Sequence, residues 1–197
     1  MNTIELTERA IAPFESKEST YETKLSESAE FAELDINSLI DLIIKEYHFK
    51  TRKDVVAIYD LAQKVFFRHS AKNHELPKLV ETLFLFFDDL LFHLKKEEQI
   101  LFPNIIQLTE KKLHEGSLNH RTFGVIKEYT HTMQNEHRDV VKQLEFFRRL
   151  TNDYRLPEDG CISYKSLFAK MKEFENEMIQ HIQLENNFLF PRAIKME

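Results

Sequence analysis

The sequence predicts an all-α protein that folds as an antiparallel, up-down-up-down four-helix bundle. Only three glycines and five prolines occur among 197 residues, so turns are few and the elements between them are long. Apolar residues recur at helical spacing through four long stretches, which are separated by short polar or glycine-containing segments. Long helices joined by short connections pack as antiparallel neighbours, which gives this topology.

Charge and cysteine content exclude several functional classes. The net charge is −6 and the basic residues are interleaved with acids, so we expect no nucleic-acid or membrane partner. The single cysteine, Cys161, rules out an internal disulfide framework or an all-thiolate metal site. The first residues lack the features of a secretory signal, and no stretch reaches the ~20 apolar residues of a spanning helix. We therefore expect a cytoplasmic protein, either a monomer or a weak dimer.

The chain divides into an N-terminal arm over residues 1–34 and a bundle over residues 35–197. The arm is rich in Glu, Ser, Thr and Lys and has few large apolar groups. Such a segment buries too little surface to offset the entropy lost on ordering, so we expect it to be largely mobile.

Two helices are predicted in the first half of the bundle. The first covers about residues 35–69, with apolar residues at helical spacing on both sides of a bend near His48. The polar segment 70–77 forms the turn. The second covers about 77–113 and begins with proline, which is favoured in the first helical turn. Pro103 is expected to bend this helix without ending it.

Two more helices are predicted in the second half. A break at residues 115–117 precedes a helix over about 119–150. Residues 151–160 form the longest loop, and the last helix runs over about 163–190, where we expect Pro191 to stop it.

One short motif occurs in both halves. In the first copy, His93 is followed four residues later by Glu97 and then by Leu-Phe-Pro; the second copy has His181, Glu185 and the same tripeptide at the same spacing. Positions i and i+4 lie on one face of a helix, so each copy points an imidazole and a carboxylate in one direction.

Counting residues from the turns places one histidine of each helix at the same height. His48 is level with His93 to within about one helical turn, His93 matches His137, and His137 matches His181 more loosely across the longest loop. Two ions held in such a layer would give the di-iron carboxylate arrangement known in helix bundles. The predicted metal ligands are His48, His93, Glu97, His137, His181 and Glu185.

The two hairpins are also offset copies of one another. His48 and His137 are 89 positions apart, His93 and His181 are 88 apart, and the motif glutamates and prolines repeat at 88. This pseudo-two-fold symmetry favours a two-metal centre, with two imidazoles for each ion and the glutamates placed to bridge.

The other five histidines are expected to be surface or packing residues. They are His69, His74, His114, His120 and His131. His69 lies 21 residues beyond His48, roughly 31 Å along a continuous helix, and would be a fifth ligand only if the helix broke and folded back.

Several residues near the predicted ligands could have either a structural or a functional role. Glu98 and Glu136 each lie next to a predicted ligand and are expected to face solvent, with orientation of a ligand or proton relay as the alternative. Tyr47 is expected to pack rather than react. Cys161 starts the last helix, where a thiol pKa can be lowered, but it lies about 20 residues from His181 and should not reach the metals.

The donor set favours iron, with manganese or zinc as alternatives. Two imidazoles and a share of two carboxylates leave coordination positions open on each ion. We therefore expect two iron ions joined by an oxo or hydroxo bridge, able to bind dioxygen, nitric oxide or peroxide.

The residues around these ligands resemble the hemerythrin-like domain of the repair-of-iron-centres family. The resemblance is carried by Tyr-His at position 48, His93-x3-Glu97 with Glu-Gln-Ile-Leu-Phe-Pro, Glu-His at position 137, and His181-Ile-x-Leu-Glu with Leu-Phe-Pro-Arg-Ala. It covers about residues 35–195 and implies a hemerythrin-like bundle, the six ligands named above, and repair of iron-sulfur clusters damaged by nitric oxide or oxidants.

The resemblance has one departure. His69 and Cys161 stand where that family commonly has His and Cys, but its members usually also carry an N-terminal domain with a Cys-Cys pair. Residues 1–34 are unlike that domain and contain no cysteine.

Three functional hypotheses follow. The first is a di-iron protein of the nitrosative and oxidative stress response that repairs iron-sulfur clusters by iron donation or nitric oxide handling; reduction of nitric oxide as an enzymatic activity stays open. Its partners would be a diatomic ligand, NO or O2, and damaged iron-sulfur proteins. The second is binding or sensing of O2 or NO without turnover. The third is a metal-free bundle scaffold.

Overall fold

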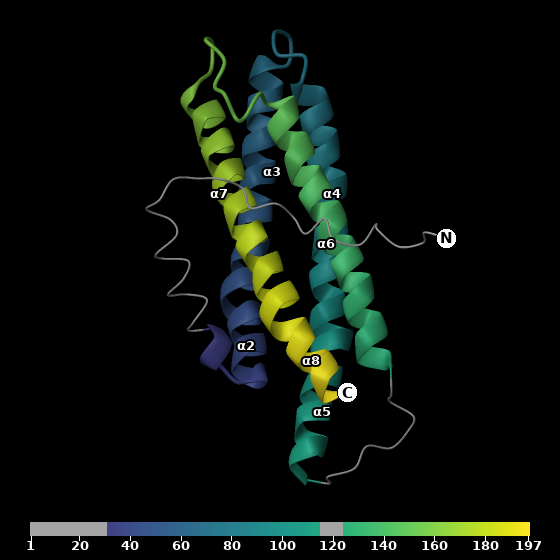
Figure 1. Cartoon of the computed structure of the whole chain (residues 1–197). Helices are drawn as coiled ribbons and strands as arrows, with labels where there is room; N and C mark the ends of the chain where they lie inside the picture. The colour runs from purple at the N-terminus through teal and green to yellow at the C-terminus, as the bar shows by residue number, and fades with distance from the viewer. Residues whose placement is uncertain (1–30, 115–123) are drawn as a thin grey trace, which may run out of the picture. The chain divides into compact units, whose positions relative to one another are not determined.

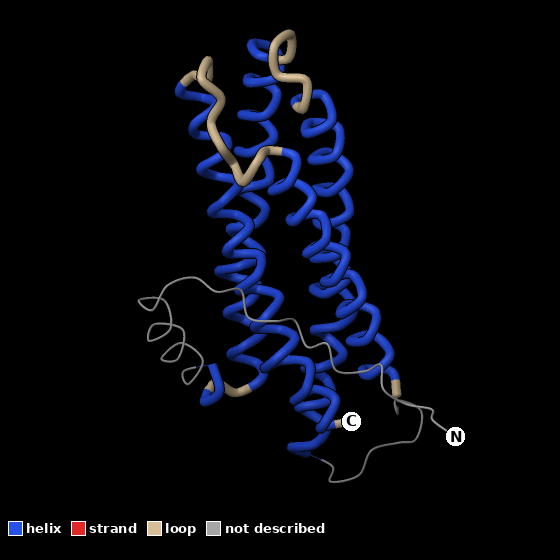
Figure 2. Tube along the Cα trace, turned by 45° about the horizontal axis from the view of Figure 1, so that its top comes forward, coloured by secondary structure: helices blue, strands red, loops and turns tan. Residues whose placement is uncertain are grey.

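The predicted all-α four-helix bundle is confirmed. A computed structural model describes residues 31–114 and 124–197, and contacts group residues 35–197 into one compact unit. In this unit four helical rods run antiparallel (Figure 1), with loops at their ends (Figure 2). The arm expected over residues 1–34 lies almost wholly outside the described residues.

Three of the rods are runs of consecutive helical segments that include a short π-helical segment, and the other rod is a single α-helix. The first rod consists of α2 (Ile36–Leu42), the π segment η1 (Ile43–His48) and α3 (Phe49–His69). The second consists of α4 (Leu76–Lys96), the π segment η2 (Glu97–Leu101) and α5 (Phe102–His114). The third is α6 (Val125–Leu150), and the fourth consists of α7 (Ile162–Leu184), the π segment η4 (Glu185–Leu189) and α8 (Phe190–Met196).

Local sequence explains where the rods begin. The Asp35 side chain accepts a hydrogen bond from the Ser38 backbone N–H at 3.0 Å and so caps α2. Proline stands in the first turn of α4, as predicted. Gly124 precedes α6 with φ of 91°, a backbone conformation that glycine adopts without strain. The expected start of this helix near residue 119 lies outside the described residues.

The expectation that Pro191 stops the last helix is wrong, because the helix continues to Met196. In a regular α-helix the proline ring clashes with the carbonyl of the preceding turn. Here η4 lies directly before it, and Phe190 donates its N–H to the Glu185 carbonyl five residues earlier. The wider π turn accommodates the ring, so the helix continues past Pro191.

The rods close around a core that leaves one layer for polar residues. Helix α3 packs on α4 and α7, and α6 packs on the same two helices. Toward the loops that follow α3 and α6, aromatic rings meet edge to face, including Phe86 with Phe147 at 5.4 Å between centroids. Toward α2, α5 and α8, buried residues such as Leu39, Phe102 and Phe190 close the other end. The predicted metal ligands lie between these two apolar regions.

The longest loop is held by a buried polar network. Asn152, Asp153 and Tyr154 all have positive φ, which is uncommon outside glycine. The Tyr154 hydroxyl donates to the buried Glu175 carboxylate at 2.8 Å, and Arg148 donates to the other oxygen of Glu175 at 2.6 Å. This network fixes the loop to α7.

Candidate metal centre

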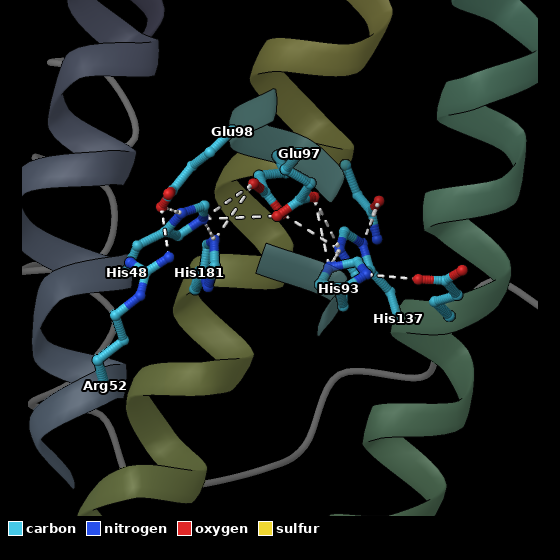
Figure 3. Close-up of polar contacts among 10 residues, drawn as sticks. His48, Arg52, His93, Glu97, Glu98, His137 and His181 are labelled. Carbon is cyan, nitrogen blue, oxygen red and sulfur yellow. Dashed lines mark hydrogen bonds and ion pairs between the residues drawn. The ribbon is translucent and has the colours of Figure 1, made fainter. Parts of the chain in front are cut away.

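The structure brings all six predicted ligand residues into one buried layer. Five of them are labelled in Figure 3: His48, His93, Glu97, His137 and His181. None of the six side chains is more than 5% exposed. They are His48 in η1, His93 in α4, Glu97 in η2, His137 in α6, His181 in α7 and Glu185 in η4. Every rod therefore contributes one imidazole.

The six residues form two overlapping groups that share both glutamates. The first position consists of His48, His181 and the two glutamates, and the second of His93, His137 and the same glutamates. Within each group the ligand atoms lie within 4.8 Å of one another. In each pair of histidines the two Nε2 atoms are 3.2 Å apart. Two nitrogen ligands at about 2.1 Å from one ion, at right angles, are about 3 Å apart, so each pair converges as ligands of a common ion do.

Each glutamate reaches toward both positions. One oxygen of Glu97 lies 3.5 Å from the His48 Nε2 and the other lies 3.4 Å from the His93 Nε2. Glu185 does the same, with one oxygen 3.2 Å from the Nε2 of His181 and the other 3.2 Å from that of His137. This is the arrangement required of carboxylates that bridge two ions.

The fit of a cation follows from the unsatisfied carboxylates. Both oxygens of Glu97 and both of Glu185 are buried and lack a hydrogen-bond partner among the described residues. An ionised carboxylate removed from water without partners is costly, because burial removes its hydration. Imidazole and carboxylate groups are suitable ligands for iron, manganese or zinc, so the residues present fit a pair of divalent cations.

Without an ion, the layer is held by charge between its own groups. Burial opposes protonation of His137, but the Glu185 and Glu97 carboxylates outweigh it and raise the pKa of His137 to about 10. Burial likewise opposes the charge on His93, and Glu97 with Glu136 raises its pKa to about 9. Burial and mutual repulsion favour the neutral acids of Glu97 and Glu185, yet the imidazoles hold the pKa of both below the ordinary value.

The π segments place three of the ligands. His48 ends η1, while Glu97 and Glu185 begin η2 and η4. In η2 and η4 the carbonyl of the glutamate accepts the N–H of the phenylalanine five residues later, directly before the proline of the motif. π turns are typical of functional sites. The Leu-Phe-Pro tail therefore marks a π turn at each glutamate of the motif, where the sequence predicted a bend at Pro103 and a helix end at Pro191.

Both phenylalanines of the motif also lie against the imidazoles. Phe102 stacks on His48 with 5.7 Å between centroids, and Phe190 stacks on His137 at 5.8 Å. They cover one side of the layer and exclude water from it. The two phenylalanines thus both fill the core and shield the layer of predicted ligands.

The expectation that Glu98 and Glu136 face solvent is wrong. Glu98 accepts a hydrogen bond from the His48 Nδ1 at 2.7 Å, and Glu136 accepts one from the His93 Nδ1 at 2.7 Å. Both carboxylates are about a third exposed or less. A helical wheel shows which side of one helix a residue occupies, but not what a carboxylate reaches on the neighbouring rod. Both carboxylates thus fix the orientation of a predicted ligand, which is the alternative role considered for them.

The remaining histidines stay outside the layer. His74 and His131 are exposed, as expected, whereas His114 and His120 fall where side chains are not described. His69 is buried at the far end of α3 and packs against the Tyr164 ring at 5.4 Å. It lies beside Cys161, the residue that caps α7, and lowers the pKa of that thiol to about 7.

The fold and site define a class of helix-bundle protein with a buried histidine and glutamate centre for cations. A family profile described as Hemerythrin HHE cation binding domain matches residues 39–193. The chain therefore belongs to the hemerythrin HHE family.

Three curated relatives share the name iron-sulfur cluster repair protein YtfE. The chain is 34% identical over 162 residues to the iron-sulfur cluster repair protein YtfE of Musicola paradisiaca, covering 82% of this chain and 67% of that protein. It is 32% identical to the protein of the same name from Dickeya chrysanthemi, covering 93% and 77% of the two chains. The Yersinia pseudotuberculosis protein is also 32% identical, with 95% and 79% covered.

The described helices do not include a candidate membrane span. None of the helices in ranges 31–114 and 124–197 combines the length and hydropathy that crossing a bilayer requires.

Proposed function

We propose that this protein is a non-haem di-iron protein of the nitrosative and oxidative stress response that repairs damaged iron-sulfur clusters, by donating iron or by handling nitric oxide. The names of its relatives support the repair role. We further propose that it acts in the cytoplasm on damaged iron-sulfur proteins, with residues 35–197 as the di-iron domain and residues 1–34 as an arm.

The observation that carries the proposal is a pair of buried carboxylates that lie between four imidazoles and lack hydrogen-bond partners among the described residues. Glu97 and Glu185 would bridge two ions, His48 and His181 would hold one ion, and His93 and His137 the other. Iron bound there would supply redox chemistry and open coordination positions. The protein's own groups fix the ligands and exclude water.

A repair assay tests the proposal. An iron-sulfur enzyme inactivated by nitric oxide is incubated with iron-loaded protein, with the iron-free protein, or with an equal amount of free Fe(II), and its activity is followed. We expect recovery with the loaded protein and much less with His181→Ala. His131→Ala is the matched control, because that histidine is exposed on α6. Equal recovery from the iron-free protein would contradict the proposal.

A second candidate is reversible capture or sensing of O2 or NO. It is favoured by the small donor set, since two imidazoles and two shared carboxylates leave positions free on an ion that accepts six ligands. Anaerobic mixing of the reduced, iron-loaded protein with nitric oxide separates the candidates. Release of nitrous oxide indicates an NO-reducing enzyme, whereas a stable adduct indicates a binding protein.

A further inference from the structure

The Nδ1 atoms of the four imidazoles differ in their hydrogen-bond partners. The Nδ1 atoms of His48 and His93 contact Glu98 and Glu136 at 2.7 Å, and the Nδ1 of His137 contacts the Asn186 oxygen at 3.0 Å. The Nδ1 of His181 is buried and has no hydrogen-bond partner among the described residues. Three of the four imidazoles therefore have an oxygen within hydrogen-bond distance of Nδ1, and His181 does not.

Pseudo-symmetry shows which partner is missing. Position 98 corresponds to position 186, and both Glu98 and Asn186 support a histidine. Position 47 corresponds to position 136, since both residues directly precede a histidine of the layer. Glu136 supports His93, but its counterpart is Tyr47, whose ring stacks on His181 at 5.5 Å between centroids. A tyrosine ring thus stands where the other half of the molecule has a carboxylate.

The difference falls on one cation position. At the position of His93 and His137, both imidazoles donate from Nδ1 to an oxygen; at the position of His48 and His181, only His48 does. An imidazole that binds a cation through Nε2 carries its proton on Nδ1, and a buried donor without an acceptor weakens binding.

Neighbouring charges do not offset this difference. Arg52 donates to Glu98 at 2.9 Å, and Lys96 donates to Glu136. Glu98 and Glu136 therefore each have one basic partner, so neither carboxylate adds an unbalanced negative charge to its cation position. The two positions therefore still differ in one respect. The Nδ1 of His137 contacts the Asn186 oxygen, whereas the Nδ1 of His181 has no acceptor among the described residues.

We propose that the two cation positions hold their ions unequally, and that the position of His48 and His181 releases its ion first because Tyr47 replaces the carboxylate expected there. This inference rests on the two-ion site of the proposed function. It identifies the ion available for transfer and makes Tyr47 and Glu136 positioning residues for the two sites. Loss or gain of such an outer partner typically changes metal affinity by 10- to 100-fold.

Release of Fe(II) to a chromophoric chelator under anaerobic conditions tests the inference. We expect two phases of equal amplitude from the loaded protein. Tyr47→Glu should slow the fast phase by 10- to 100-fold and leave the slow phase unchanged. Tyr47→Phe is the matched control and should leave the fast phase in place, because it keeps the ring and adds no acceptor.

A second variant keeps the test valid if Tyr47→Glu does not fold. Glu136→Gln should accelerate the slow phase and leave the fast phase unchanged. A single phase in the wild type, or acceleration of the fast phase by Glu136→Gln, would overturn the assignment. Binding of fewer than two ions would reject the di-iron proposal itself, whereas two-phase release without cluster repair would reject only the repair function.

Discussion

The Nε2 atoms of His93 and His137 face each other at 3.2 Å across the bundle, although the residues are 44 positions apart. Glu136 and Asn186 present oxygens to their outer nitrogens, so each neutral imidazole carries its proton on Nδ1. Two lone pairs then point at one another. A proton or a metal ion between them removes this repulsion, which makes the pair a site for a cation and a source of pH dependence.

Cation binding should release protons. In the ion-free protein, carboxylates raise the pKa of His93 to about 9 and that of His137 to about 10, so this pair of imidazoles holds an added proton at pH 7. Metal competes with this proton, and affinity should therefore rise as the pH is raised toward those values and fall as it is lowered. Calorimetric titration in two buffers of different ionisation enthalpy measures the release; identical heats in both buffers would contradict it.

Removing one bridging charge should affect both ions. Glu97→Gln keeps the shape of the side chain but loses the charge that both positions share, so we expect affinity at each to fall by more than roughly 100-fold. His93→Ala should weaken one position more than the other. Metal analysis after gel filtration measures the ions retained. Glu173→Gln is the control, because that exposed carboxylate only pairs with Lys50 at the surface.

The Cys161 thiol should react at neutral pH. Its pKa of about 7 depends mainly on His69, so the rate of alkylation should rise with a midpoint near pH 7. In His69→Ala the midpoint should move up toward the ordinary thiol value. The midpoint, rather than the absolute rate, is compared, since the substitution also changes packing near Tyr164. An unchanged midpoint would show that His69 does not control the thiol.

The loop after α6 should depend on one hydroxyl. Tyr154→Phe leaves one oxygen of the buried Glu175 without its hydrogen bond, which should lower the free energy of unfolding by about 1–3 kcal/mol. Denaturant unfolding of the ion-free protein measures the loss. Tyr129→Phe, at an exposed position on α6, should change stability little.

Sequence patterns predicted the rods and the shared layer of histidines, because helical periodicity and residue counts from the turns depend only on regular geometry. They did not predict η1, η2 or η4, since a π turn differs from an α turn by one residue and leaves the apolar pattern almost intact. They also assigned Glu98 and Glu136 to solvent. What those carboxylates reach depends on how closely neighbouring rods approach, which is a tertiary property.

The three π segments have a further consequence for how this chain can vary. Each fits one more residue into its turn than an α-helix would, so the side chains beyond it point as they would in an α-helix that is one residue shorter. Deleting one residue of η2 between Glu97 and Leu101 would therefore leave Leu101 and Phe102, which are buried, facing the interior, and would remove only the π turn that begins at Glu97. The packing of the rods should thus tolerate the loss of one residue at a π segment, whereas the turn that carries Glu97 or Glu185 would change.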